Sequence, residues 1–328
     1  MYSHVYINLD ASRRVVRTYN CHRREYETMT DGARRFDGVH CPLVTPFDGG
    51  TVDHEALGAL VDHVVDGGVD GLVPCGTTGE FASLDDAESR AVLETTVERA
   101  AGRPVMAGTA ATSVAATVDR IDVAAEVGAD AALITLPYFH GSNDPSGDVA
   151  FVESVADESA LPLYLYNIPA CVGRSLGADA VVDLAEHGAI RGLKDSSGDL
   201  NYFSELLRRT PDAFQLFEGF DSHLVPGLVL GATGGVNALS NVVPEAFVAA
   251  ATAADRGDVA EARRIHERHI APLFQQCVEH GFAPATKAAL RARGVLETAE
   301  VRPPLVGLDK TARGEISSLV ETSVAAYR

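Results

Sequence analysis

Eight short apolar segments, each followed by a polar turn and most then by a helical pattern, limit the possible folds more than any other feature. They cover residues 39–44, 71–75, 104–108, 131–136, 163–166, 190–194, 214–218 and 234–238. Successive segments begin 20–33 residues apart, which is about the length of one strand–helix unit. The segments are apolar throughout instead of alternating, as expected for parallel strands that are buried on both faces.

Closing eight such units predicts an α/β fold, the (β/α)8 TIM barrel, over residues 37–257. Between the strands, apolar residues recur at helical spacing, as in residues 57–65. Ser83, with Asp86 three residues later, predicts a capped helix start. A doubly wound open sheet is the alternative fold. No Gly-x-Gly-x-x-Gly pattern follows the first strand, however, and eight units exceed what such folds usually need.

The two ends of the chain differ from the predicted barrel. Residues 1–36 hold seven arginines and four acidic residues and show no strand or helix period, so we expect a basic, disordered N-terminal extension. Met29 is an alternative start of the native protein. After the barrel only helical patterns follow, which predicts a C-terminal helical appendage over residues 258–328 with helices near 258–280, 284–293 and 312–327.

Composition and charge exclude several classes of function. The net charge is −19, and such an acidic surface repels nucleic-acid phosphates, so no nucleic-acid partner is expected. No uncharged apolar run is long enough to span a membrane. The five cysteines include no Cys-x-x-Cys pair, and no secretion signal is recognisable, so we expect a cytoplasmic location.

Lysine is unusually scarce in this chain. Only Lys194, Lys287 and Lys310 occur among 27 basic residues. Many acidic residues combined with few lysines resemble the composition of proteins adapted to high salt. Lys287 and Lys310 fall in the C-terminal region or its linker, where we expect ordinary protonated amines with a pKa of about 10.4.

Reactive side chains gather where the predicted strands end. In a TIM barrel these ends meet at one rim, and active sites occupy that rim. Lys194 closes the sixth strand, where burial is expected to lower the pKa of its amine and favour nucleophilic attack. Tyr166 ends the fifth strand at the same level, and Thr77 and Thr78 follow the second. The structural alternatives are a lysine paired with Asp195, a core tyrosine and a plain tight turn.

Three motifs, in this order, resemble the dihydrodipicolinate synthase/N-acetylneuraminate lyase superfamily of class I pyruvate-dependent aldolases. They are Gly76-Thr77-Thr78-Gly79-Glu80, Tyr166-Asn167-Ile168-Pro169 and Gly192-Leu193-Lys194-Asp195. Residues 231–236 and 302–304 are also similar to that family. The resemblance therefore runs from about residue 37 to the end of the chain.

The resemblance implies a carbon–carbon lyase in which Lys194 forms a Schiff base with a small 2-oxo acid. It implies that Tyr166 is the acid–base group, that Thr78 relays protons, and that Thr77 and Thr78 bind the substrate carboxylate. The other substrate-binding positions are then Tyr138, Gly219, Asp221 and Val236. Because a protonated imine itself withdraws electrons from C3, no metal or organic cofactor is required. The family also implies a homotetramer.

Two departures from the synthase pattern concern the second substrate. Dihydrodipicolinate-forming members usually have an arginine for the aldehyde's carboxylate where this chain has Cys171. They also use a second tyrosine, from the neighbouring subunit, where this chain has Phe139. Gly219-Phe220-Asp221 and Lys194-Asp195-Ser196 instead resemble sugar-acid lyases and 2-keto-3-deoxygluconate aldolases. We therefore expect cleavage of 2-keto-3-deoxygluconate, or its 6-phosphate, to pyruvate and glyceraldehyde or its 3-phosphate.

Other functions stay open at this point. The enzymatic alternatives are a 4-hydroxy-tetrahydrodipicolinate synthase, an N-acetylneuraminate lyase-like enzyme and a keto-deoxy sugar-acid dehydratase. Ser222 disfavours sialic acid, because the sialic-acid enzymes have a glutamate after this Asp. The non-enzymatic alternative is a regulatory barrel that binds a 2-oxo acid without turnover. Such a protein would be expected to lose at least one of Lys194, Tyr166 and Thr78.

Overall fold

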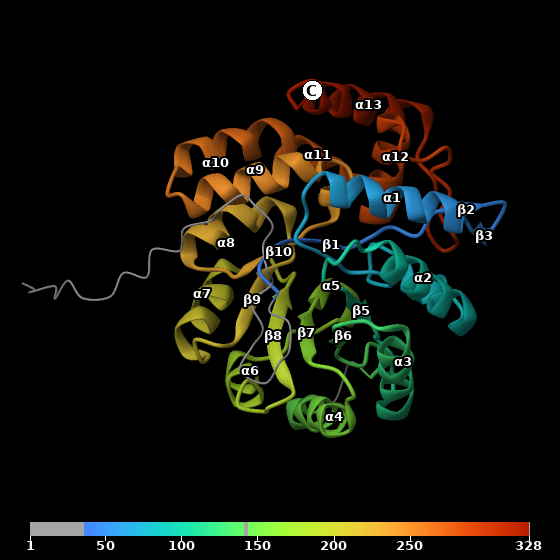
Figure 1. The fold of residues 1–328 in the computed structure, drawn as a ribbon. Coiled ribbons are helices and arrows are strands. Elements are labelled where there is room, and N and C mark those ends of the chain that lie inside the picture. Colours follow the sequence, from blue (N-terminus) through green and yellow to red (C-terminus); the bar gives the residue numbers. More distant parts are fainter. Residues whose placement is uncertain (1–35, 141–143, 328) are drawn as a thin grey trace, which may run out of the picture. The chain divides into compact units, whose positions relative to one another are not determined.

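The computed structural model describes residues 36–140 and 144–327, in which eight parallel strands form a barrel (Figure 1). The strands are β1 (Gly38–Cys41), β4 (Gly71–Leu72), β5 (Met106–Gly108), β6 (Ala131–Thr135), β7 (Leu163–Asn167), β8 (Ile190–Asp195), β9 (Gln215–Glu218) and β10 (Gly234–Val236). They pair in the order β4-β1-β10-β9-β8-β7-β6-β5, and a parallel bridge between Leu72 and Val105 joins the two end strands. The predicted TIM barrel is confirmed, and the open-sheet alternative is wrong.

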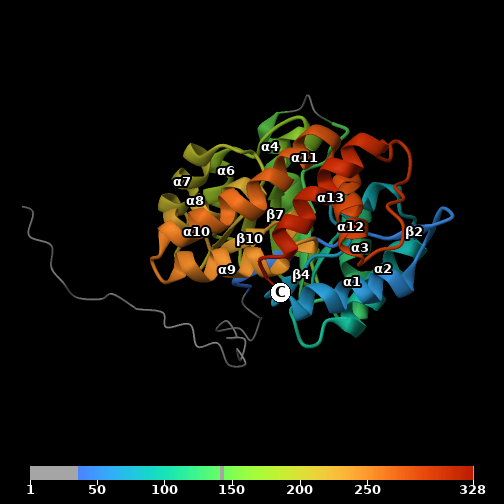
Figure 2. The same ribbon diagram turned by 90° about the horizontal axis from the view of Figure 1, so that it is seen from above.

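Helices alternate with the strands and cover the outside of the barrel (Figure 1 and Figure 2). They are α1 (His54–Asp66), α2 (Asp86–Arg99), α3 (Val114–Val127), α4 (Pro145–Glu158), α6 (Ala178–Leu184), α7 (Leu200–Arg209), α8 (Leu224–Leu230) and α9 (Pro244–Asp255). A hairpin of β2 (Phe47–Asp48) and β3 (Thr51–Val52) precedes α1, and the short α5 (Pro169–Val172) follows β7. The carboxyl ends of the strands therefore meet at one rim, where the predicted site residues lie.

The start of α2 shows how local chemistry sets a helix boundary. Asp85 Oδ1 accepts a hydrogen bond from the Glu88 amide at 2.8 Å, and Glu88 Oε2 accepts one from the Asp85 amide at 3.1 Å. This reciprocal capping box fixes the first helical residue at Asp86. The predicted cap at Ser83 is wrong, because Ser83 instead ends a 3₁₀ turn over Phe81–Ser83.

The C-terminal region is helical, as predicted. It contains α10 (Val259–Ile265), the π-helical turn η4 (His266–Ile270), α11 (Ala271–His280), α12 (Phe282–Arg293) and α13 (Lys310–Val324). Its side chains do not form a core of their own. Leu290 of α12 and Ile316 of α13 belong to one buried cluster with Leu57 of α1 and Phe247 of α9. Both views show α12 next to α13 (Figure 1 and Figure 2).

Phe36 already belongs to the packed barrel. Its ring is 1% exposed, and its centroid lies 5.3 Å from that of Tyr164 and 5.4 Å from that of His40. The expected extension thus ends before Phe36, and its remaining residues, 1–35, lie outside the described part of the chain.

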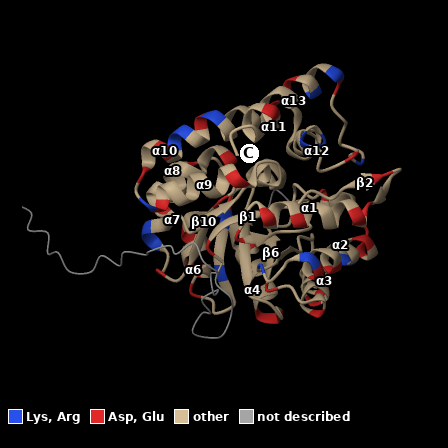
Figure 3. Cartoon of the chain, turned by 45° about the horizontal axis from the view of Figure 1, so that its top comes forward, with Lys and Arg blue, Asp and Glu red and all other residues tan. Residues whose placement is uncertain are grey.

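The surface is acidic, as the composition requires. Asp and Glu residues lie on the outer helices, including α1 and α2 (Figure 3). In the described ranges, no helix combines the length and the apolar character needed to cross a membrane. Adaptation to high salt stays a prediction.

Candidate active site

Tyr166 and Lys194 lie side by side at the carboxyl ends of β7 and β8. They are Cα partners in the parallel register, so their side chains point to the same side of the sheet. Lys194 Nζ lies 4.0 Å from the centroid of the Tyr166 ring. The two residues are only 5% and 8% exposed. The structure thus brings together the two residues to which the sequence assigns the central chemistry, with the amine over the face of the ring.

The next residue of each strand points to the other side and locks the two strand ends together. Asn167 Nδ2 donates to Asp195 Oδ1 at 2.7 Å, and Asn167 Oδ1 accepts from the Leu176 amide at 3.1 Å. Ser197 Oγ donates to Asp195 Oδ2 at 2.8 Å. Burial raises the pKa of the Asp195 carboxyl, whereas the hydrogen bonds from Ser197 and Asn167 lower it. This network holds the backbone directly behind Tyr166 and Lys194.

Gly219 leaves the space that Lys194 occupies. A Cβ atom at this position would lie 2.0 Å from Ser196 Oγ, 2.7 Å from the Asp195 carbonyl oxygen and 3.0 Å from Lys194 Cε. The Gly219 amide also donates to that carbonyl at 2.7 Å. The sequence assigns Gly219 to substrate binding. The structure adds a packing reason for a glycine here, because a side chain would collide with Ser196 and with the backbone of Asp195, directly after Lys194.

The turn from Gly76 to Gly79 presents the two threonines and is held in a strained conformation. Cys75 before it and Glu80 after it both have φ of 56°, in the left-handed region that side chains disfavour. The Gly79 amide donates to the Gly76 carbonyl at 3.0 Å. Thr78 is 8% exposed, whereas Thr77 is exposed to solvent. The proton relay from Thr78 to Tyr166 stays a prediction.

The other predicted substrate contacts have different environments. Tyr138 is 41% exposed, and its ring lies edge-on to Phe81 with centroids 6.5 Å apart. Val236 is buried in β10. Asp221 is completely buried and accepts a hydrogen bond from the Leu239 amide at 2.7 Å. Burial raises the pKa of Asp221 to about 6, although backbone amides and Lys194 lower it. Contact of these residues with substrate stays a prediction.

The sequence analysis assigns no role to two buried ionisable residues. Glu218 is 1% exposed at the end of β9 beside Asp195, and its Oε1 has no hydrogen-bond partner within the described ranges. Burial and the Asp195 charge raise its pKa to about 8. A carboxylate that ends an apolar strand is the signal that could have identified it.

Lys287 is the second such residue, and the prediction of an ordinary amine is wrong for it. Its side chain is fully buried and donates to Glu80, at the end of the threonine turn. Burial lowers the pKa of the Lys287 amine, and the Glu80 carboxylate opposes that shift. The scarcity of lysine in this chain is the signal that could have singled it out.

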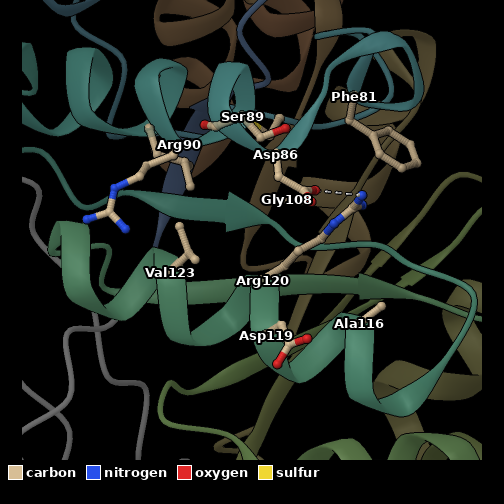
Figure 4. Close-up of a pocket in the computed structure, with 11 residues that line it drawn as sticks. Phe81, Asp86, Ser89, Arg90, Gly108, Ala116, Asp119, Arg120 and Val123 are labelled. Atoms are coloured by element: carbon tan, nitrogen blue, oxygen red, sulfur yellow. Dashed lines mark hydrogen bonds and ion pairs between the residues drawn. The ribbon is translucent and has the colours of Figure 1, made fainter.

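A cavity of about 290 Å³ lies away from Lys194, between α2 and α3 (Figure 4). Cys75 and Gly108 line it from the strand ends, and Asp86 and Arg120 form an ion pair of 3.7 Å across it. Its lining includes none of the predicted catalytic residues. Across the described ranges, no group of three or more His, Cys, Asp or Glu side chains is placed to hold a metal ion.

Comparison with known proteins decides the family. Residues 35–323 match the Dihydrodipicolinate synthetase family. The chain belongs to this family. It is therefore an enzyme of the class I aldolase type, a carbon–carbon lyase, as its motifs predict.

Several relatives in the family cover almost the whole described structure. A 4-hydroxy-tetrahydrodipicolinate synthase from Exiguobacterium sp. AT1b is 38% identical over 288 residues, which are 87% of this chain and 97% of the relative. The synthase of Thermomicrobium roseum is also 38% identical, over 83% of this chain and 89% of its own. The crystal structure of dihydrodipicolinate synthase from Aquifex aeolicus matches with a TM-score of 0.83 at 34% identity, covering 87% of this chain and 97% of its own.

The names of these relatives bear on the predicted subfamily. They are names of the synthase, which the sequence analysis keeps as an alternative, and not of a sugar-acid aldolase. The superfamily is thus confirmed, whereas the closest resemblance to 2-keto-3-deoxygluconate aldolases is not. A structure described as a monomeric dihydrodipicolinate synthase variant also matches, with a TM-score of 0.84 at 25% identity over 88% of this chain and 97% of its own.

Proposed function

We propose that the chain is a Schiff-base aldolase whose nucleophile is Lys194 and whose first substrate or product is pyruvate. The observation that carries this proposal is the position of Lys194 Nζ, buried at the rim and 4.0 Å from the ring centroid of Tyr166. A lysine that is sheltered from water beside a phenol has both the nucleophile and the acid–base group that imine formation needs.

In the proposed reaction, the neutral Lys194 amine adds to C2 of the 2-oxo acid, and water leaves to give a protonated imine. Loss of a proton from C3, or cleavage of the C3–C4 bond, then gives an enamine because the imine nitrogen accepts the electron pair. Tyr166 moves the protons in these steps, with Thr78 as its relay. The turn with Thr77 and Thr78 binds the carboxylate. The enamine then takes a proton at C3, or attacks the aldehyde of a second substrate, and either step restores the imine. Water finally hydrolyses this imine and releases the lysine.

Two candidate reactions remain, and they differ in the compound that is joined to pyruvate or released with it. The names of the relatives support the first, the synthase reaction, in which the pyruvate enamine attacks aspartate 4-semialdehyde. One position supports the second, a 2-keto-3-deoxy sugar acid that is cleaved to pyruvate and an uncharged or phosphorylated aldehyde. That position is Cys171, which replaces the arginine expected to bind the carboxylate of the semialdehyde.

The structure supports the importance of Cys171. The residue is exposed, and partial desolvation of its thiol raises its pKa while the Lys194 charge lowers it, so the thiol lies in the field of the lysine. The next arginine along the chain, Arg174, is already engaged. It donates to Asp148 at 2.7 and 2.5 Å and to the Pro137 carbonyl at 3.1 Å. Arg174 therefore does not offer a free guanidinium in place of the missing one.

The covalent half of the proposal is tested by trapping the imine. Incubation with pyruvate and borohydride should leave a secondary amine on Lys194 and inactivate the enzyme, and peptide mapping can separate this site from the two other lysines. Lys194→Arg should lose both adduct and turnover, because a guanidinium does not deprotonate in proteins. Tyr166→Phe should form the adduct slowly and lower turnover by roughly 10²–10⁴-fold. An adduct only on Lys287 or Lys310, or full activity of Lys194→Arg, would contradict the mechanism.

The second substrate is decided by comparing kcat/KM for two reactions in the same high-salt buffer. One is condensation of pyruvate with aspartate 4-semialdehyde, and the other is pyruvate release from 2-keto-3-deoxygluconate and its 6-phosphate. The faster reaction identifies the acceptor, and product analysis separates cleavage from dehydration. A protein that forms the adduct but turns over none of these compounds would match the regulatory alternative. The proposed homotetramer is tested by light scattering, and a cytoplasmic location stays a prediction.

A further inference from the structure

The C-terminal region reaches the threonine turn through a buried ion pair. Lys287, in the middle of α12, donates to a carboxylate oxygen of Glu80, which lies 207 positions earlier in the chain. The two side chains are 1% and 0% exposed. Glu80 is only two residues beyond Thr78. This contact is therefore a direct physical link between α12 and the segment expected to bind the pyruvate carboxylate.

Every charged atom of this pair is engaged. Lys287 Nζ also donates to the Glu300 carbonyl at 2.7 Å and lies 4.1 Å from the centroid of the Phe47 ring. The second oxygen of Glu80, Oε2, accepts from the Arg302 amide at 3.0 Å. A buried charge pair is tolerated only when both partners are satisfied in this way. The pair therefore has one well-defined geometry.

Arg302 makes further hydrogen bonds to the residues that follow the threonine turn. Its guanidinium donates to both oxygens of Glu88, at 2.7 and 2.6 Å, and to the carbonyls of Ser83 and Gly50, each at 2.7 Å. Glu88 is also part of the capping box that starts α2. The residues that follow the turn are therefore held at Glu80 and again at the start of the next helix.

The turn needs such support because its conformation is unfavourable by itself. Glu80 has a left-handed φ of 56°, which costs about 1–3 kcal/mol for a residue with a side chain and persists only where the surroundings enforce it. The Glu80 amide donates to the Thr77 carbonyl at 3.1 Å, and Thr45 Oγ1 donates to the Gly79 carbonyl at 2.7 Å. Releasing the Glu80 side chain would allow φ of Glu80 to relax and would shift the two threonines.

We propose that Lys287 is a positioning residue for pyruvate: its ion pair with Glu80 holds Thr77 and Thr78 in the geometry that binds the substrate carboxylate. Lys287 does not touch the substrate. The expected effect on pyruvate binding rests on the proposed function. The expected effect of α12 on the conformation of the threonine turn does not. A displacement of about 1 Å at a binding group can cost about 10²-fold in rate. Loss of the Lys287 ion pair should therefore change the measured kinetics, although Lys287 does not touch the substrate.

The test compares Lys287→Met with Arg293→Met. Methionine keeps much of the length of the lysine side chain and removes its charge. Arg293 lies at the end of the same helix and forms a partly exposed ion pair with Glu245, with distances of 2.6 and 3.1 Å, far along the sequence from the turn. It thus controls for the loss of an ion pair on α12. The two readouts are hydrogen exchange of residues 75–84 and the pyruvate concentration that gives half-maximal trapping of Lys194 by borohydride.

We expect Lys287→Met to accelerate exchange in residues 75–84 and to raise half-saturation by pyruvate about 10- to 100-fold, with Arg293→Met within about twofold of the native protein. If Lys287→Met does not fold, Glu80→Gln keeps the shape of the side chain and should change both readouts in the same direction. Unchanged exchange and half-saturation in the folded variant, or equal changes in Arg293→Met, would overturn the inference. Absence of any adduct in the native protein would instead refute the proposed function, and the exchange readout would still decide the coupling.

Discussion

Replacement of Gly219 by alanine is expected to inactivate the enzyme by displacing Lys194. The new methyl group would lie 2.0 Å from Ser196 Oγ, 2.7 Å from the Asp195 carbonyl oxygen and 3.0 Å from Lys194 Cε, whereas ordinary contacts of a Cβ are 3.4–4 Å. Ser196 can rotate its hydroxyl group away. The Asp195 carbonyl cannot, because it belongs to the backbone directly after Lys194 and accepts the Gly219 amide. Relief therefore requires the two strand ends to separate by roughly half an ångström to one ångström.

The magnitude follows from this displacement. Inserting a methyl group into a packed site costs typically about 1–3 kcal/mol of stability, and a misplacement of about 1 Å can cost about 10²-fold in rate. Stability is measured by calorimetry, and the rate by trapping of the Lys194 adduct with pyruvate and borohydride. Gly188→Ala is the matched control, because Gly188 lies in the turn just before β8, the strand that carries Lys194, and has no neighbouring atom within 4 Å. Its effect should stay within about 0.5 kcal/mol.

A second variant separates the two collisions. Adding Ser196→Ala to Gly219→Ala removes the shortest contact but leaves the carbonyl in place. Stability should then recover in part, whereas the trapping rate should stay low. Gly219→Ala with the trapping rate and melting temperature of the native protein would refute the packing explanation, as would an equal loss in Gly188→Ala.

Three further predictions address specificity, pH and salt. Cys171→Arg should raise kcat/KM for aspartate 4-semialdehyde by roughly 10- to 150-fold, because a charged hydrogen bond contributes about 1.5–3 kcal/mol; an unchanged value would show that position 171 does not face this substrate. Burial raises the pKa of Glu218 from 4.5 to about 8, so the folded protein keeps a proton that the unfolded chain has lost, and stability should fall as pH rises through this interval. Glu218→Gln should flatten that fall in a series of melting curves, and equal slopes in both proteins would contradict the assignment. Because acidic residues on the outer helices repel one another, the melting temperature should be lower in dilute buffer than in molar KCl. A melting temperature that does not change with KCl concentration would contradict adaptation to high salt.

Local patterns were sufficient to predict the barrel and the juxtaposition of Tyr166 and Lys194. Strands that are apolar on both faces and separated by helical periods indicate a parallel sheet covered by helices, and eight such units favour closure into a barrel over an open sheet. Because parallel strands end at one rim, the sequence also places Tyr166 and Lys194 next to each other, and the structure has them as register partners. Helix boundaries were less predictable, since Asp85 and Ser83 are both acceptable caps and only the capping box with Glu88 selects between them.

The same patterns could not rank the second substrate. The motifs that identify the family belong to the pyruvate half of the site, whereas the acceptor depends on a few residues around the mouth, such as Cys171 and Phe139. These two positions weakened the synthase interpretation, and the segments Gly219-Phe220-Asp221 and Lys194-Asp195-Ser196 favoured a sugar acid. The names of the relatives favour the synthase. Side chains of this kind act through their position relative to a substrate, which neither spacing nor overall similarity specifies.

The sequence by itself determined the fold class and the neighbouring positions of Tyr166 and Lys194 at one rim, because the first follows from periodicity and the second from adjacent strand ends. Only the tertiary structure decided that Lys287 supports the threonine turn through Glu80 and that Gly219 makes room for the lysine. These contacts join residues that are 207 and 25 positions apart. They depend on how α12 packs on the barrel and how closely β8 and β9 approach. Hydrophobic periodicity predicts that a face is buried, but it does not predict which side chain packs against that face.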